Sequence, residues 1–218
     1  MSEPVSRSPI ALASPVRVEA GWEVSGCVSD AALTITDCTA LAKVHLRAPW
    51  NGAMAKALGV PFGRASREGG GPDEAWLVVG SGPGEWFVFA PPGAAAVAAG
   101  WLGAVAADSA PEEFVSVVDL THGRALVRVT GPDAAELLAR LCGAELHDDM
   151  APGGAAVRSA VAGVATDIIR DDIVYDGAAV PSYLLHCERS SGQYLSGALV
   201  SAGESLGIGV DGFRLPGF

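Results

Sequence analysis

The sequence predicts an α+β fold built from two diverged lobes, each with the element order strand–helix–strand–strand–helix. The first observation is an internal resemblance. With Pro49 aligned on Pro132, the stretches 42–58 and 125–141 place apolar residues at matching positions. The second is that each stretch continues into further strand patterns and a closing helix pattern. The third is composition, since 50% of the 218 residues are hydrophobic, which is ample for a buried core.

The first lobe is expected to span residues 23–110. Within it, residues 42–48 alternate between apolar and polar side chains, as a half-buried strand does. Pro49 then opens a helix, because the N–H that proline lacks is one that the first helical turn does not use. Gly59 stands where the end of this helix favours a left-handed residue.

The rest of the first lobe reads as a hairpin followed by an alanine-rich helix. Residues 75–79 and 85–89 are the strands, and the Gly80–Gly84 segment is the turn between them. The uncharged stretch 86–107 is long enough to cross a bilayer. Because Pro91-Pro92-Gly93 interrupts it, a strand, a turn and a helix are the better interpretation.

The second lobe is expected to span residues 111–211. An alternating strand over 125–130 leads to Pro132, and Leu137, Leu138 and Leu141 then form one apolar helix face. Three further strands and a final helix follow at 160–165, 166–170, 182–186 and 191–202.

The two ends of the chain carry no periodic pattern. Residues 1–22 contain three prolines and are expected to form an extended N-terminal arm, mobile or laid along a partner. The C-terminal tail, 212–218, holds two phenylalanines and a leucine that need a surface to dock on, either the protein's own body or another chain. Trp22 lies outside the periodic elements, which makes it a candidate interface anchor.

Charge and cysteine content exclude several classes of function. Lys and Arg number 14 against 25 Asp and Glu, a formal net charge of −11 that repels nucleic acids and anionic membranes. The four cysteines lie far apart without a C-x-x-C pair, which argues against a zinc site and against a disulfide framework. Buried thiols in a reducing cytosol and the lack of a signal-peptide pattern predict a cytoplasmic protein.

The motifs that could carry chemistry have simpler structural interpretations. The Gly80–Gly84 segment leads into a strand rather than a helix, and Pro83 removes an amide donor, so it is not a dinucleotide loop. Asp119 and His122 approach a strand, where Asp and Thr side chains commonly bond to backbone amides. His147-Asp148-Asp149 is a run of metal-type ligands, but consecutive residues rarely converge on one ion. The sequence therefore predicts no catalytic, cofactor-binding or metal residue on this chain.

An ordered set of segments resembles a known family. The stretch 118–134, VDLTHGRALVRVTGPDA, is similar to the gamma subunits of heterotetrameric sarcosine oxidases. Supporting matches run along most of the chain: Ser8-Pro9-Ile10, Gly82 to Phe87, Leu137-Leu138, Cys142, Arg158, Arg170, Arg189-Ser190 and Tyr194-Leu195. The strand that runs into Gly131-Pro132-Asp133-Ala134 and a helix also resembles the folate-binding aminomethyltransferase fold.

This resemblance implies a role in a complex. Heterotetrameric sarcosine oxidase oxidatively demethylates sarcosine to glycine, with hydrogen peroxide and either formaldehyde or methylenetetrahydrofolate as further products. It implies that FAD, FMN, NAD and tetrahydrofolate bind to partner subunits and not to this chain. The expected partners are the alpha, beta and delta subunits, and the expected role is that of a non-catalytic structural subunit. Trp22, Arg124 and Phe218 are the residues expected at the interface.

Two other functions stay open from the sequence. One is a stand-alone folate-binding or aminomethyl-transferring protein, which needs a carboxylate beside a pterin pocket; Asp119 is the candidate. The other is a small-molecule binding module without a partner chain.

Overall fold

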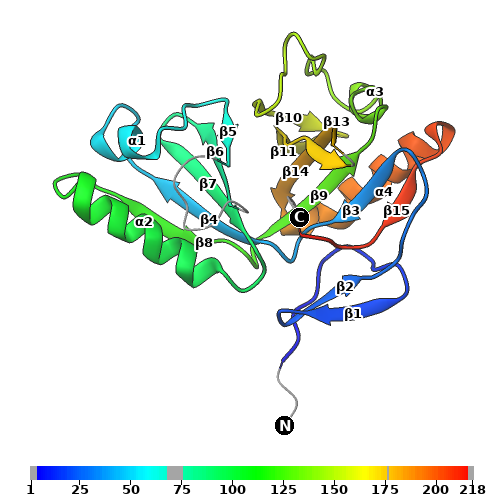
Figure 1. The fold of residues 1–218 in the computed structure, drawn as a ribbon, viewed down its shortest axis with the longest axis horizontal. Coiled ribbons are helices and arrows are strands. Elements are labelled where there is room, and N and C mark those ends of the chain that lie inside the picture. The colour runs from blue at the N-terminus through cyan, green and yellow to red at the C-terminus, as the bar shows by residue number, and fades with distance from the viewer. Residues whose placement is uncertain (1–3, 68–75, 176, 216–218) are drawn as a thin grey trace.

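Two sheets and four α-helices form the body of the protein in a computed structural model, which describes residues 4–67, 76–175 and 177–215 (Figure 1). The five-stranded sheet has the order β5-β6-β7-β4-β8, and the six-stranded sheet has the order β10-β11-β14-β9-β3-β15. The strands of the first are β4 (Ala42–Arg47), β5 (Ala65–Ser66), β6 (Leu77–Gly82), β7 (Glu85–Ala90) and β8 (Ser116–Asp119). Those of the second are β3 (Thr34–Asp37), β9 (Arg124–Thr130), β10 (Ala156–Val161), β11 (Val164–Arg170), β14 (Ser182–Glu188) and β15 (Gly209–Asp211).

Helices cover the outer face of each sheet, so the molecule has four layers. The α-helices are α1 (Ala53–Leu58), α2 (Ala95–Ser109), α3 (Ala134–Ala139) and α4 (Gly192–Gly203), with short 3-10 turns η1 (Arg189–Ser191) and η2 (Glu204–Leu206). Two separate hairpins are β1 (Val16–Glu19) with β2 (Trp22–Ser25), and β12 (Ile173–Tyr175) with β13 (Ala178–Val180). The predicted α+β fold with two strand–helix–strand–strand–helix lobes is confirmed: β4-α1-β6-β7-α2 is followed, after β8, by β9-α3-β11-β14-α4, with β5, β10, β12 and β13 as additional strands.

Three apolar cores correspond to the spaces between the layers. Met54 of α1 and Leu102 of α2 pack on one face of the five-stranded sheet, and Leu138 of α3 and Leu199 of α4 pack on one face of the six-stranded sheet. The middle core joins the two sheets. Its members from the first sheet are Ala65, Leu77, Val79, Phe87 and Phe89, and those from the second are Leu126, Ala156, Ile169 and Leu184. Because strand side chains alternate between faces, each sheet serves two cores at once.

The lobes exchange strands. β3 leads into β4 but pairs with β9, whereas β8 leads into β9 but pairs with β4. The sheets therefore do not divide at the expected boundary between 23–110 and 111–211, because each lobe places its leading strand beside the central strand of the other. Such a pairing joins residues far apart in sequence, which local periodicity does not encode.

The same three-residue motif stabilises both crossings. After β3, the Asp37 carboxylate accepts a hydrogen bond from the Thr39 N–H (2.9 Å), and the Thr39 hydroxyl accepts one from the Leu126 N–H (3.2 Å).

After β8, the Asp119 carboxylate accepts one from the Thr121 N–H (2.9 Å), and the Thr121 hydroxyl accepts one from the Lys43 N–H (3.0 Å). The predicted backbone-bonding role of the Asp and Thr in this segment is confirmed, and the two copies of Asp-x-Thr agree with an internal duplication.

The arm expected over residues 1–22 lies along the protein's own body in its described part. Ile10 is 7% exposed and belongs to the core under α4, and the Ala11 N–H donates to the Gln193 side chain (2.7 Å). The tail docks on the same body: Phe213 is 1% exposed in the middle core. No helix among the residues that the structure describes has the length and apolarity needed to cross a bilayer.

Candidate functional site

A set of charged and aromatic side chains lies where the two sheets meet, and we refer to it as the junction cluster. The ends of β4 and β7 supply one part of it, and β9, β10, β11 and β14 supply the other. Its members are His45, Arg47, Glu85, Phe87, Arg124, Arg158, Asp167, His186 and Glu188. Cross-strand register explains five of its pairs. Arg47 lies opposite Glu85 and His45 opposite Phe87. Arg158 lies opposite Asp167, Asp167 also opposite His186, and Arg124 opposite Glu188.

The innermost pair of the junction cluster is His186 with Asp167. The His186 Nδ1 lies 3.1 Å from an Asp167 carboxylate oxygen, and the side chain of His186 is fully buried. Burial lowers the pKa of His186 more than the hydrogen bond to Asp167 raises it, which favours a neutral ring. Burial raises the pKa of Asp167, but the hydrogen bonds from His186 and Arg158 outweigh this and keep the carboxyl ionised.

The geometry places the remaining ring nitrogen of His186 away from water. Its Nε2 is buried and has no hydrogen-bond partner among the described residues, and the ring lies edge-on to Phe87 (4.5 Å between centroids) and Phe89 (5.3 Å). A general base needs a nitrogen within hydrogen-bond reach of the proton that it removes. A buried nitrogen enclosed by two phenylalanine rings is not available to a substrate, so this pair is suited to joining the sheets.

The outer part of the junction cluster consists of arginines paired with carboxylates. Arg158 is half exposed and joins Asp167 (2.7 Å) to Glu85 (3.5 Å), and Arg47 binds the other oxygen of Glu85. The hydrogen bond to Asp167 raises the pKa of Arg158. Arg124 pairs with Glu188 (2.5 Å) and its guanidinium lies 6.0 Å from the centroid of the Phe87 ring. The cluster is thus a surface of matched charges that reaches from the middle core to solvent.

A second ion-pair network fastens the segment after β5 to the six-stranded sheet. Asp171 accepts from Arg128 (2.5 Å) and from Arg67 (2.7 Å), and Arg128 also donates to the Ser182 hydroxyl (2.6 Å). Burial raises the pKa of Asp171, but Arg128 and Arg67 together lower it by more, so the carboxyl stays ionised. These ion pairs therefore connect the segment after β5 to the six-stranded sheet.

Lys43 is a buried cationic group at the strand exchange. Its Nζ donates to the carbonyl oxygens of Thr39 (2.7 Å), Leu41 (2.8 Å) and Thr121 (3.4 Å). Burial lowers the pKa of Lys43 to about 7, although the nearby Asp37 raises it. The side chain is 0% exposed, so the amine binds the two crossing segments together and is not open to a substrate.

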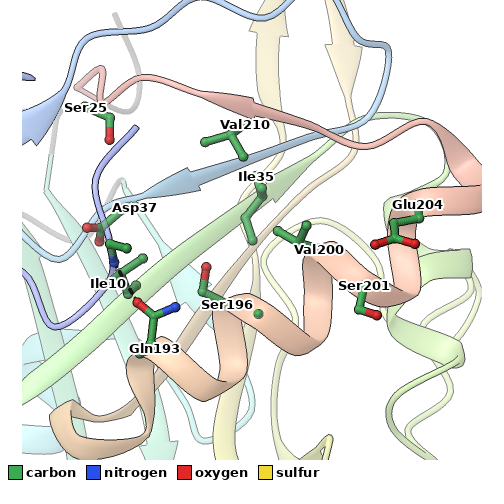
Figure 2. Close-up of a pocket in the computed structure, with 12 residues that line it drawn as sticks. Ile10, Ser25, Ile35, Asp37, Gln193, Ser196, Val200, Ser201, Glu204 and Val210 are labelled. Carbon is green, nitrogen blue, oxygen red and sulfur yellow. Dashed lines mark hydrogen bonds between the residues drawn. The ribbon is translucent and has the colours of Figure 1, made fainter. Parts of the chain in front are cut away.

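A groove of about 330 Å³ runs between α4 and the β3–β15 edge, closed at one end by the N-terminal arm (Figure 2). Asp37 lies near one end beside Gln193, and Glu204 lies near the other. Its apolar wall includes Ile10, Ile35, Val200 and Val210, and its hydroxyls come from Ser25, Ser196 and Ser201. Among the described residues that line the groove, none carries a positive charge. An anionic ligand would therefore meet two carboxylates and no cation.

The structure places the residues predicted from the sequence in different parts of the molecule. Trp22 is only 4% exposed and stacks on His122 at 4.9 Å, so its ring is covered by its own chain and has little surface to offer a partner. Arg124 belongs to the junction cluster and is partly exposed. Phe218 lies outside the described residues. Asp148, from the run of metal-type ligands, pairs with Arg170 (2.5 Å), and no group of three or more metal-type ligands occurs within 4–67, 76–175 and 177–215.

Sequence reasoning missed most of the junction cluster. A partial signal was present, because Asp167 and His186 are buried polar residues in two largely apolar strands, although Thr166, Arg170 and Ser182 of the same strands are buried and polar as well. What the sequence did not give is the pairing of those two strands, which brings the two side chains together.

Comparison with known proteins gives structural neighbours only. No protein-family model matches the chain, and no curated protein sequence matches it. A chain of the heterotetrameric sarcosine oxidase from Corynebacterium sp. U-96, solved in complex with pyrrole 2-carboxylate, is similar with a TM-score of 0.63 and 21% identity, over 82% of this chain and 87% of that chain.

The glycine cleavage system aminomethyltransferase T from Bartonella henselae is similar with a TM-score of 0.65 and 18% identity. The similarity covers 90% of this chain but only 55% of that enzyme's chain. The fold is the one these two proteins share. The predicted resemblance to the aminomethyltransferase fold is confirmed at the level of fold.

Proposed function

We propose that this protein is a non-catalytic structural subunit of a sarcosine-oxidase-type complex. The observation that carries the proposal is the match in length. Since 82% of this chain corresponds to 87% of one chain of a heterotetrameric sarcosine oxidase, the two chains are nearly equal in size. The aminomethyltransferase, in contrast, extends far beyond the part that corresponds to this protein.

The internal chemistry supports a structural role. The buried ionisable side chains of the junction cluster and of the strand exchange are bound to groups of the same chain, as His186 is to Asp167 and Lys43 is to three carbonyl oxygens. A group held in this way stabilises a fold, but it is not placed to exchange protons with a bound substrate.

The cofactors of the complex belong, in this proposal, to its partner subunits. FAD, FMN and NAD carry phosphates, and tetrahydrofolate carries the carboxylates of its glutamyl tail. The groove beside α4 does not fit these anions, because Asp37 and Glu204 face it and its described lining has no cation. The arginines of the junction cluster are already paired with carboxylates. This mismatch argues against folate binding in that groove.

The test is co-expression with the flavin-binding subunits of a sarcosine oxidase from the same organism, followed by sizing and visible spectroscopy. The expected result is one flavin-coloured complex that contains this chain. A chain that stays alone beside those subunits and binds tetrahydrofolate by itself would overturn the proposal.

Two variants test the non-catalytic part of the proposal. In the assembled complex, Asp119→Asn and His122→Ala are expected to change sarcosine turnover by less than about two-fold, because Asp119 bonds to a backbone amide and His122 stacks on Trp22. Loss of turnover in a complex that still assembles would show that this chain takes part in the chemistry.

A further inference from the structure

Exposed aromatic side chains gather at the end of the five-stranded sheet beside α1. Arg47 of β4 lies opposite Ser116 of β8 in an antiparallel pair. The chain leaves β4 toward Trp50 and enters β8 from Phe114, so both residues lie beyond the same end of the sheet. The Glu113 carboxylate confirms this, because it accepts from the Ala53 N–H of α1 at 2.5 Å.

These aromatic rings are largely exposed and are not part of the core of the protein. Trp50 is 54% exposed and Phe114 is 84% exposed, whereas Met54 and Leu58 of the nearby α1 are buried in the core. Phe62 is 53% exposed, and its backbone bridges Gly80 near the β6–β7 turn of the same sheet. We name Trp50, Phe62 and Phe114 the aromatic end.

The aromatic end continues into the junction cluster. The Ala48 N–H donates to the carbonyl of Gly84, which brings the loop that carries Trp50 to the β6–β7 turn. Glu85 follows in that turn and binds Arg47 and Arg158. Aromatic rings next to arginines are the composition enriched at the centres of protein–protein interfaces.

From this continuity we propose that the aromatic end, together with Arg47 and Arg158, is the surface that docks on a flavin-binding subunit of the proposed complex. This inference rests on the proposed function. Exposed carboxylates flank the rings, since Glu112 lies two residues before Phe114 and Asp108 lies near the end of α2. The complementary partner surface is an apolar patch that carries lysine or arginine opposite Glu112 and Asp108 and carboxylates opposite Arg47 and Arg158.

The experiment measures the affinity of this chain for the purified flavin-binding subunits of a sarcosine oxidase from the same organism, each tested separately. The variants are Trp50→Ser, Phe114→Ser and the two combined. Tyr194→Ser is the matched control, because Tyr194 is an aromatic residue on α4 that is 62% exposed on the other sheet's side of the molecule. Thermal unfolding of each variant checks that the fold is kept.

The expected result is that the double variant loses about 30-fold or more in affinity, the effect of removing an interface hot spot, while Tyr194→Ser changes it by less than about two-fold. Glu112→Lys is expected to slow association, most clearly at low salt. If the wild type assembles and the double variant binds equally well, the docking surface is wrong while the proposed function stands. If the wild type itself does not bind these subunits, both are overturned.

Discussion

Lys43 is the residue whose charge bears most directly on the strand exchange. Its folded pKa of about 7 lies below the ordinary value of 10.5, so above pH 7 the unfolded chain binds a proton that the folded chain has released. The free energy of unfolding is therefore expected to rise with pH between about 7 and 10. The stabilisation gained in that range is lost as the pH falls through 7.

Replacing Lys43 tests this linkage. Lys43→Met leaves three carbonyl oxygens without their donor and is expected to lower the free energy of unfolding by about 1–3 kcal/mol at neutral pH. Urea unfolding from pH 7 to 9 should show the wild type gaining about 2 kcal/mol relative to the variant. If the free energy of unfolding has the same pH dependence in the two proteins, the dependence does not arise from Lys43.

His186 should make the protein sensitive to acid. Its pKa is lowered in the folded state below the ordinary value of 6.5, so the stability it contributes is present above that value and is lost as pH falls through the folded pKa. His186→Asn places an amide N–H near the position of Nδ1 but does not titrate. Urea unfolding below pH 6.5 should show a smaller loss for this variant than for the wild type; an equal loss would assign the acid sensitivity to other groups.

At the scale of single elements, α1 depends on a carboxylate from a distant loop. Gly52 provides no side-chain cap, and Glu113 instead accepts from the N–H groups of Ala53 and Met54. This acidic side chain also faces the positive end of the helix. The short helix is thereby fastened to the segment that enters β8.

Removing this cap gives a prediction with a neighbouring control. Glu113→Ala is expected to lower the free energy of unfolding by about 1–2 kcal/mol, the usual cost of a lost N-cap. Glu112→Ala, at the exposed neighbour, is expected to change it by less than about 0.5 kcal/mol. Chemical denaturation measures both, and equal effects would mean that the cap adds nothing.

For the whole molecule, the N-terminal arm acts as part of the core. Ile10 is 7% exposed beneath α4, although its arm carries no periodic pattern. Ile10→Ala is expected to cost about 2–4 kcal/mol, because the buried methyl groups leave a cavity. Ala11→Ser, at an exposed neighbour, should be close to neutral in the same unfolding measurement. A small effect at Ile10 would show that the arm is only loosely attached.

The elements were predictable where the pattern was local. Alternation before Pro49 and Pro132 predicted β4 and β9. The glycine-rich segment predicted the β6–β7 hairpin, but the expected turn over Gly80–Gly84 was too long, since Gly80 to Gly82 belong to β6. Long-range pairing was not predictable in this way. Trp22 looked unanchored because His122, which stacks on it, is 100 residues further along the chain.

The site was less predictable than the fold. The Asp119 bond to a backbone amide followed from the residue type alone, but its counterpart at Asp37 was missed although both segments read Asp-x-Thr. The junction cluster forms only when four strands of one sheet meet two of the other. No spacing in the sequence encodes that meeting.

The strand exchange means that neither half of this protein is complete by itself. A polypeptide ending at residue 110 would contain β3 without β9 and β4 without β8. The remaining polypeptide, from residue 111, would contain β9 without β3 and β8 without β4. The fragments 1–110 and 111–218, made separately, should thus be poorly ordered alone. When mixed they should reconstitute the native circular dichroism spectrum, in the manner of a split reporter.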